Sequence, residues 1–112
     1  MTPIFEITQA ERNCWQRQAA AELTRILQAH RDLPPIAWTV GPAGSVLIGQ
    51  ISGLAPAAQV REVFGGWRSA LALEEYREHQ MSAGAVWLHA ATRRNRVKIR
   101  LSATVFGESE DA

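Results

Sequence analysis

Two runs of alternating apolar and polar residues near the C-terminus constrain the fold of this chain more than any other feature. Residues 86–92 and 97–105 both place an apolar side chain at every second position. A period of two is typical of a β-strand with one buried and one solvated face. A turn centred on Arg94-Asn95 would set Leu88 opposite Leu101, so that apolar faces meet. The pattern predicts an antiparallel hairpin. The positions expected to be buried in its second strand are Val97, Ile99, Leu101, Ala103 and Val105.

Two helices are predicted upstream of this hairpin. The first covers residues 9–30, where apolar side chains recur at intervals of three and four, and Thr8 begins a capping-box sequence before it. The second begins near Pro56, because proline suits the first turn of a helix. The adjacent glycines Gly65 and Gly66 cost the second helix about 2 kcal/mol relative to two alanines, which indicates a close contact or a bend. Its apolar stripe consists of Val60, Val63, Phe64, Trp67 and Leu71.

Another hairpin is expected between the two helices. Residues 36–40 and 46–51 show the strand period of two on either side of residues 41–44, whose composition is typical of a turn. A four-residue turn would set Trp38 opposite Leu47.

The predicted elements follow one another in the order α-β-β-α-β-β. One domain is expected over residues 1–107, because 112 residues of which 46% are apolar can bury one hydrophobic core. Residues 1–7 are interpreted as an arm or a short edge strand, residues 74–80 as a helix end or a loop, and residues 108–112 as an acidic, solvated tail. The expected fold class is α+β, with a four-stranded antiparallel sheet and two helices on one face.

No pattern of residues indicates catalysis. The histidines His30, His79 and His89 fall on different predicted elements, and Cys14 is the single cysteine. There is no paired Cys-x-x-Cys pattern for zinc and no glycine-rich loop with the ending of a phosphate-binding loop. We therefore expect a protein that is not an enzyme and has no catalytic residues, metal or cofactor. The lack of a signal-peptide pattern and of an apolar run of about 20 residues predicts a cytoplasmic protein without membrane association.

The C-terminal hairpin concentrates positive charge. Residues 79–107 contain five basic residues and no acidic residue, although the net charge of the chain is only +1. Clustered cations bind phosphates, and unpaired bases stack on aromatic rings. Charges on an exposed strand also prevent edge-to-edge aggregation, which is the simpler interpretation. The residues predicted to bind nucleic acid are Arg93, Arg94, Arg96, Lys98, Arg100, Trp87 and His89.

A second unusual surface comes from a stretch without charge. Residues 33–60 contain no Asp, Glu, Lys or Arg, so the outward face of the first hairpin offers little charge to water. Either this hairpin is a central pair of strands, or its face is an interface. The leading prediction is a non-enzymatic binding or assembly module that forms a homo-oligomer or binds a protein partner. Nucleic-acid binding by the basic hairpin is the alternative. The expected interface residues are Ala37, Thr39, Val46, Ile48, Gln50 and Trp87.

Overall fold

The computed structural model describes residues 8–41, 45–51 and 55–107. The expected N-terminal arm, the acidic tail and most of the turn at residues 41–44 lie outside the described residues. The described part of the chain has an α+β fold. Its elements in chain order are α1 (Gln9–Ala29), β1 (Ala37–Val40), β2 (Val46–Ile51), α2 (Ala57–Ala70), β3 (Glu75–Gln80), a short 3₁₀ turn η1 (Ser82–Gly84), β4 (Val86–Arg94) and β5 (Val97–Val105).

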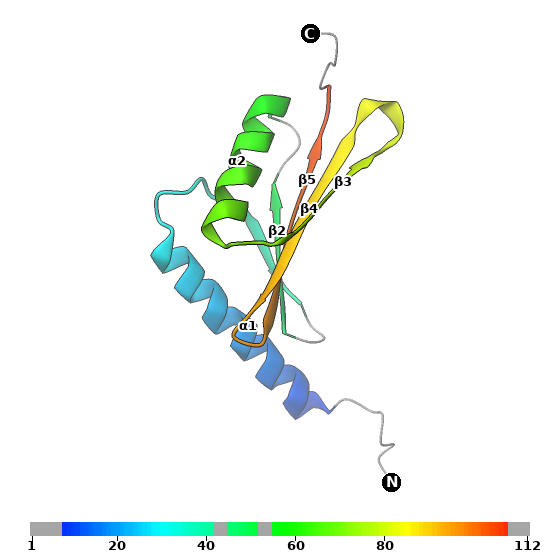
Figure 1. Cartoon of the computed structure of the whole chain (residues 1–112). Helices are drawn as coiled ribbons and strands as arrows, with labels where there is room; N and C mark the ends of the chain where they lie inside the picture. Colours follow the sequence, from blue (N-terminus) through cyan, green and yellow to red (C-terminus); the bar gives the residue numbers. More distant parts are fainter. Residues whose placement is uncertain (1–7, 42–44, 52–54, 108–112) are drawn as a thin grey trace.

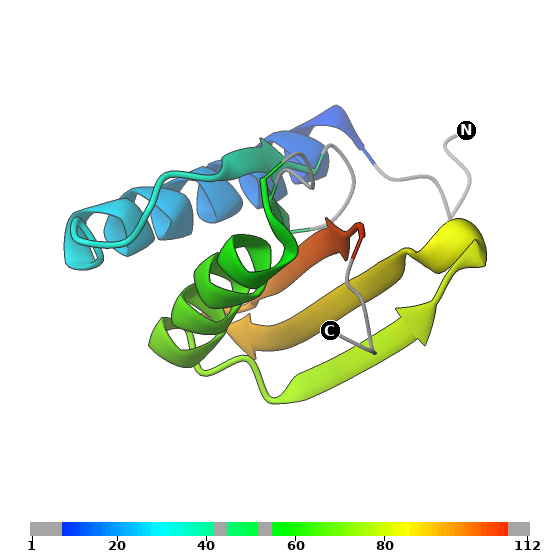
Figure 2. The ribbon, with the colours of Figure 1, turned by 90° about the horizontal axis from the view of Figure 1, so that it is seen from above.

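The five strands form one mixed sheet, and both helices lie on the same face of it (Figure 1). The strand order is β1-β2-β5-β4-β3, and every neighbouring pair is antiparallel except β2 and β5, which run parallel. Figure 2 shows the helices stacked over this twisted sheet as a second layer. The predicted α+β class and the two helices are confirmed, whereas the predicted four-stranded, purely antiparallel sheet is wrong.

The third strand is the element that the sequence patterns did not predict. Residues 75–80 pair along β4 as an edge strand, whereas the sequence predicts a helix end or a loop at this position. Their composition shows no apolar alternation, because Tyr76 alone packs against the core and the other side chains are exposed. An edge strand of charged residues is stable because its neighbour satisfies one row of backbone groups, while its charges discourage pairing with another chain.

The last hairpin has the predicted faces but a different register. All five β5 positions expected in the core are buried, which confirms the alternation. Leu88, however, pairs with Ala103 and not with Leu101. Only Asn95 and Arg96 form the loop, with φ of 50° and 67°, as in the two-residue turns that match the twist of a hairpin. A shift of two residues keeps every side chain on its face, so the burial prediction holds although the register was wrong.

The first hairpin departs from prediction in the same way. Trp38 pairs with Gly49, two residues beyond the expected Leu47. A Cβ atom on Gly49 would lie 3.1 Å from the Trp38 ring and 3.0 Å from Ile36 Cδ1, so the missing side chain makes room for the indole. Trp38 also meets Trp67 edge to face, with ring centroids 5.7 Å apart. This contact joins the edge of the sheet to α2.

One hydrophobic core lies between the sheet and the helices. Trp67 is buried at its centre, and its indole Nε1 donates a hydrogen bond to the Pro34 carbonyl oxygen at 2.8 Å. In α1, the Thr8 hydroxyl accepts a hydrogen bond from the Glu11 backbone N–H at 3.1 Å, as the capping-box sequence predicted. Neither described helix is both long and apolar enough to cross a membrane.

Candidate functional site

One face of the sheet has no described element over it. Because strand residues alternate between faces, the side chains opposite the helices can be assigned from the pairing register. We call this surface the uncovered face. Its members are Ala37, Thr39, Val46, Ile48, Gln50, Glu75, Arg77, His79, Trp87, His89, Ala91, Arg93, Lys98, Arg100, Ser102 and Thr104.

Three aromatic rings stack in a row on this face. Trp87 lies between His79, its cross-strand partner on β3, and His89, two residues along β4. The ring centroids are 5.5 Å apart for His79 and Trp87 and 5.0 Å apart for Trp87 and His89, with interplanar angles of 27° and 24°. We call this row the aromatic stack. Trp87 and His89 are half-buried and His79 is exposed, so the aromatic stack is partly open to solvent, with the two imidazoles on either side of the indole.

Cations from β3 and β5 lie around the inner end of the aromatic stack, at His89. Burial lowers the pKa of His89 below its ordinary value of 6.5. The positive charges of Arg100, Lys98 and Arg77 lower this pKa further, because they oppose a further positive charge on the ring. The nearby carboxylate of Glu75 opposes this effect, but the pKa of His89 stays below its ordinary value because the surrounding charge is mainly positive.

A basic pocket lies where the uncovered face meets α1. It has a volume of about 560 Å³, within the usual range for small-molecule sites. Among the described residues that line it, four side chains are cationic and none is acidic. The lining residues are Trp15, Gln18, Ser45, Val46, Arg93, Arg96, Lys98 and Arg100.

Hydrogen bonds at the start of β2 position the α1 wall of the basic pocket. The Ser45 hydroxyl donates to Gln18 Oε1 at 3.0 Å. The Ser45 carbonyl oxygen accepts a hydrogen bond from the Lys98 backbone N–H at 2.8 Å. Ser45 therefore connects the helix to both parallel central strands, which keeps Trp15 beside the cations of β5.

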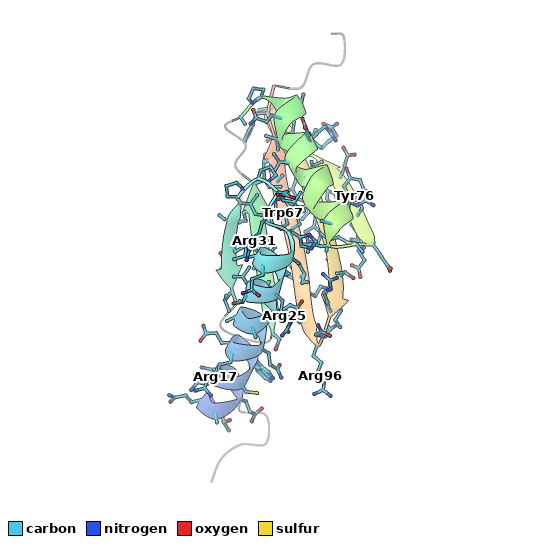
Figure 3. All side chains as sticks on the ribbon, turned by 90° about the vertical axis from the view of Figure 1, so that its left-hand side faces the viewer. Arg17, Arg25, Arg31, Trp67, Tyr76 and Arg96 are labelled. Carbon is cyan, nitrogen blue, oxygen red and sulfur yellow. The ribbon has the colours of Figure 1, made fainter. Side chains whose placement is uncertain are left out.

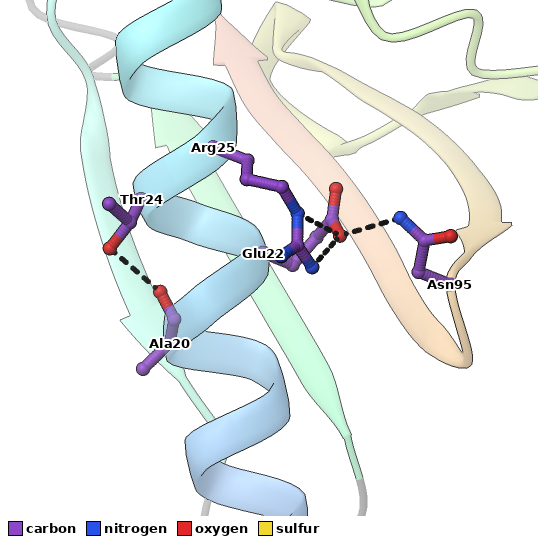
Figure 4. A network of polar contacts seen from close by, with 5 residues as sticks. All are labelled: Ala20, Glu22, Thr24, Arg25 and Asn95. Atoms are coloured by element: carbon purple, nitrogen blue, oxygen red, sulfur yellow. Dashed lines mark hydrogen bonds and ion pairs between the residues drawn. The ribbon is translucent and has the colours of Figure 1, made fainter.

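The turn that carries Arg96 is fixed from the other side by a buried carboxylate (Figure 4). Glu22 on α1 is 3% exposed, and its Oε1 accepts hydrogen bonds from Asn95 Nδ2 at 3.0 Å and from Arg25 Nη2 at 2.7 Å. Burial by itself raises the pKa of Glu22, but the hydrogen bonds from Asn95 and Arg25 and the nearby positive charges hold it below the ordinary value of 4.5. The charged carboxylate thus holds the β4–β5 turn against the helix.

The structure brings most of the predicted site residues onto one surface. All six residues of the expected interface lie on the uncovered face, together with His89, Arg93, Lys98 and Arg100. Arg96 lines the basic pocket from the turn, and Figure 3 shows it projecting from that end of the sheet. Arg94 does not join them, because it lies on the opposite side of the hairpin and lines a separate hollow with Glu22 and Asn95.

The residues of this surface and its pocket that were not predicted include Arg77, His79, Trp15 and Gln18. Arg77 and His79 were missed because their segment showed no strand pattern, and only pairing with β4 brings them beside His89 and Trp87. Trp15 has the helical spacing of a core residue, but it is half-buried and lines the basic pocket with Gln18. The sequence held one signal for the position of Trp15. This tryptophan lies near the start of the helix, before the apolar stripe is complete.

This surface offers cationic side chains, which can attract anions, and aromatic rings, which can stack with planar groups. Within residues 8–41, 45–51 and 55–107, no group of three or more His, Cys, Asp or Glu side chains is placed to hold a metal ion. The chain matches no protein-family model and no curated protein in sequence.

Proposed function

We propose that this protein is a non-enzymatic nucleic-acid-binding protein that holds a single strand along the uncovered face. The observation that carries the proposal is the row of His79, Trp87 and His89 in line with the cations of β5. Bases stack on aromatic rings, and phosphates bind clustered cations, which is how sequence-tolerant single-strand binders work. Along β4, the seven residues from Trp87 to Arg93 span about 20 Å, room for several nucleotides.

The pairing of the hairpin favours a single strand over a duplex. A two-stranded ribbon can enter the major groove of DNA, but only if it projects freely. Here β3 covers the edge of β4 at residues 86–91 and β2 covers the edge of β5 at residues 98–103. The segment that extends as a ribbon is therefore residues 92–97, and the aromatic stack lies outside it. A broad open face with exposed rings suits unpaired bases.

Within the described part of the chain, no carboxylate forms an ion pair with the cations of this surface, although Glu75 lies on the same face. Among the described residues, the ion pairs are Glu22 with Arg25 and Glu78 with Arg61, and neither involves a side chain of the uncovered face. Arg93, Lys98 and Arg100 are thus available to phosphates. Each phosphate that they neutralise should contribute a slope of about −0.7 to a plot of log K against log salt concentration.

Fluorescence anisotropy with labelled oligonucleotides of about 12 nucleotides tests the proposal. We expect single-stranded probes to bind more tightly than the matched duplex. Trp87→Ala should weaken binding by about 1–3 kcal/mol through lost stacking. Lys98→Gln combined with Arg100→Gln should make the salt dependence shallower by about 1.4.

The matched control removes the same charge from the helix layer. Arg17→Gln combined with Arg31→Gln changes two exposed arginines that lie along and just after α1 (Figure 3), and neither lines the basic pocket. This variant should bind like the wild type. If no single-stranded or duplex probe shifts at low salt, the proposal is wrong. Tighter binding to the duplex would contradict the argument for a single strand.

Assembly through the uncharged part of the same face is a second candidate function. The side chains of Val46 and Ile48 are half-buried by their neighbours on the sheet, and no described element covers them. Exposed uncharged patches on a sheet mark contacts with other chains. The patch adjoins the cations, because Ile48 pairs with Arg100, so one molecule could use both areas. We propose that any homo-oligomer forms through this part of the face.

A further inference from the structure

We propose that the basic pocket receives the terminal phosphate of the bound strand, so that the protein prefers phosphorylated ends. This inference rests on the proposed function, because the pocket adjoins the face along which the strand would lie. Three cations, Arg93, Lys98 and Arg100, belong to both the face and the pocket. The fourth, Arg96, comes from the β4–β5 turn at the end of the sheet.

The charge of the pocket suits a phosphate monoester better than a diester. A terminal monoester carries a charge of about −1.5 to −2 at pH 7, and clustered arginines bind it through charge-assisted hydrogen bonds. An internal diester carries a single negative charge. Four cationic side chains around about 560 Å³, with no carboxylate among the described lining residues, exceed what one diester needs. Arginine forks also provide several donors to the free oxygens of a terminal group.

The position of α1 explains why the strand would end there. Trp15 and Gln18 come from α1 and form one wall of the pocket, and Ser45 links that wall to the start of β2. A strand that runs along β4 and β5 towards the turn meets this wall. Its last phosphate would then lie among Arg93, Arg96 and Lys98. The accessible part of the Trp15 ring provides a surface on which the terminal base can stack.

End-modified oligonucleotides of one sequence test this inference by fluorescence anisotropy competition. The probes carry a 5′-phosphate, a 3′-phosphate or hydroxyl groups at both ends, and a circular oligonucleotide of the same composition has no end. We expect one phosphorylated end to bind about tenfold more tightly than the hydroxyl form, because it adds charge-assisted hydrogen bonds. The circle should bind no more tightly than the hydroxyl form.

Variants separate the pocket from the aromatic stack. Arg96→Gln and Gln18→Ala should remove the preference for the phosphorylated end and leave affinity for the hydroxyl form nearly unchanged. Trp87→Ala should weaken both forms equally. Arg94→Gln is the matched control, since Arg94 is two residues from Arg96 but lines a different hollow, and it should keep the preference. Circular dichroism establishes that each variant is folded.

The outcomes distinguish this inference from the proposed function. If oligonucleotides bind but phosphorylated and hydroxyl ends compete equally, the inference is overturned while the proposed function stands. If inorganic phosphate abolishes the end preference as effectively as a nucleoside monophosphate does, the pocket is a site for free phosphate and the inference fails. If no oligonucleotide binds, the proposed function fails and the inference fails with it.

Discussion

Glu22 shows how a single buried charge can organise a binding surface at a distance. The carboxylate does not line the basic pocket, yet it holds the turn from which Arg96 reaches that pocket. A buried carboxylate is stable only when donors surround it, and here Asn95 and Arg25 supply them. Glu22 is therefore a positioning residue for the β4–β5 turn.

Replacing this carboxylate should reduce stability in a pH-dependent way. Glu22→Gln should lower the free energy of unfolding at pH 7 by about 1–3 kcal/mol, because charged hydrogen bonds are lost. The pKa of Glu22 is lowered in the folded state, so its contribution is present above the ordinary value of 4.5 and is lost as the pH falls through the folded-state pKa. Urea unfolding from neutral to acidic pH should show the two proteins converging in acid.

The control for this experiment is an exposed carboxylate on the other helix. Glu62 is exposed on α2, and Glu62→Gln should leave the unfolding free energy nearly unchanged across the same pH range. A Glu22→Gln protein as stable as the wild type at pH 7 would mean that the carboxylate does not hold the turn.

At the scale of an element, the glycines of α2 and β2 have opposite surroundings. A Cβ atom on Gly65 would meet no atom within 4 Å, and one on Gly66 would lie 3.5 Å from Leu33 Cδ2, an ordinary contact. At Gly49 of β2, the corresponding atom would press on Ile36 and Trp38. The close contact expected at the α2 glycines is therefore found only at Gly66. The glycine with the most crowded surroundings of the three is Gly49, in β2.

Alanine substitutions at these glycines should therefore change stability in opposite directions. Gly65→Ala should raise the free energy of unfolding by about 0.5–1 kcal/mol, because alanine restricts the unfolded chain and favours the helix. Gly66→Ala should be neutral or mildly stabilising. Gly49→Ala should lower the free energy, since the added methyl group displaces the Trp38 ring. Thermal unfolding of the three variants measures these shifts, and a destabilised Gly65→Ala protein would contradict the open surroundings of Gly65.

The edge strand β3 contributes Arg77 and His79 to the candidate site because of where it pairs in the sheet. Tyr76 anchors it, since the Arg68 guanidinium lies 4.3 Å from the centre of the Tyr76 ring and the Tyr76 hydroxyl donates to Glu78 at 2.7 Å. With Tyr76 on the helix side, Arg77 and His79 alternate to the uncovered face. A strand that adds only one side chain to the core thus extends the binding surface.

For the whole molecule, the two candidate functions lead to different solution behaviour. If the uncharged part of the face forms a homo-oligomer, Ile48→Lys should give monomers, because an interface tolerates an unpaired charge poorly. Light scattering at tens of micromolar, roughly the concentration at which a binding free energy of −6 to −7 kcal/mol is visible, measures this. Ala58→Lys provides a matched charge at an exposed position of α2, outside the uncovered face, and should leave the assembly unchanged. A monomeric wild-type protein at that concentration would exclude assembly of this strength.

Alternation and helical spacing were sufficient to predict the local elements of this chain. Both helices, both hairpins and the buried set of β5 follow from patterns within about 20 residues, because such patterns report which face of an element avoids water. The same patterns placed Lys98, Arg100 and Trp87 on a common solvated face. They could not give the registers, since a shift of two residues leaves every side chain on the same face.

Long-range pairing decided the rest. The parallel contact between β2 and β5 joins the uncharged strand to the basic one, and the pairing of β3 with β4 brings His79 beside Trp87. These contacts connect residues tens of positions apart, and no local pattern encodes which strand becomes the neighbour of which. The basic pocket likewise exists only because α1 packs so that Trp15 meets the end of β5. A side chain's exposure follows from its own segment, whereas its neighbours in space follow from how the whole chain buries its apolar surface.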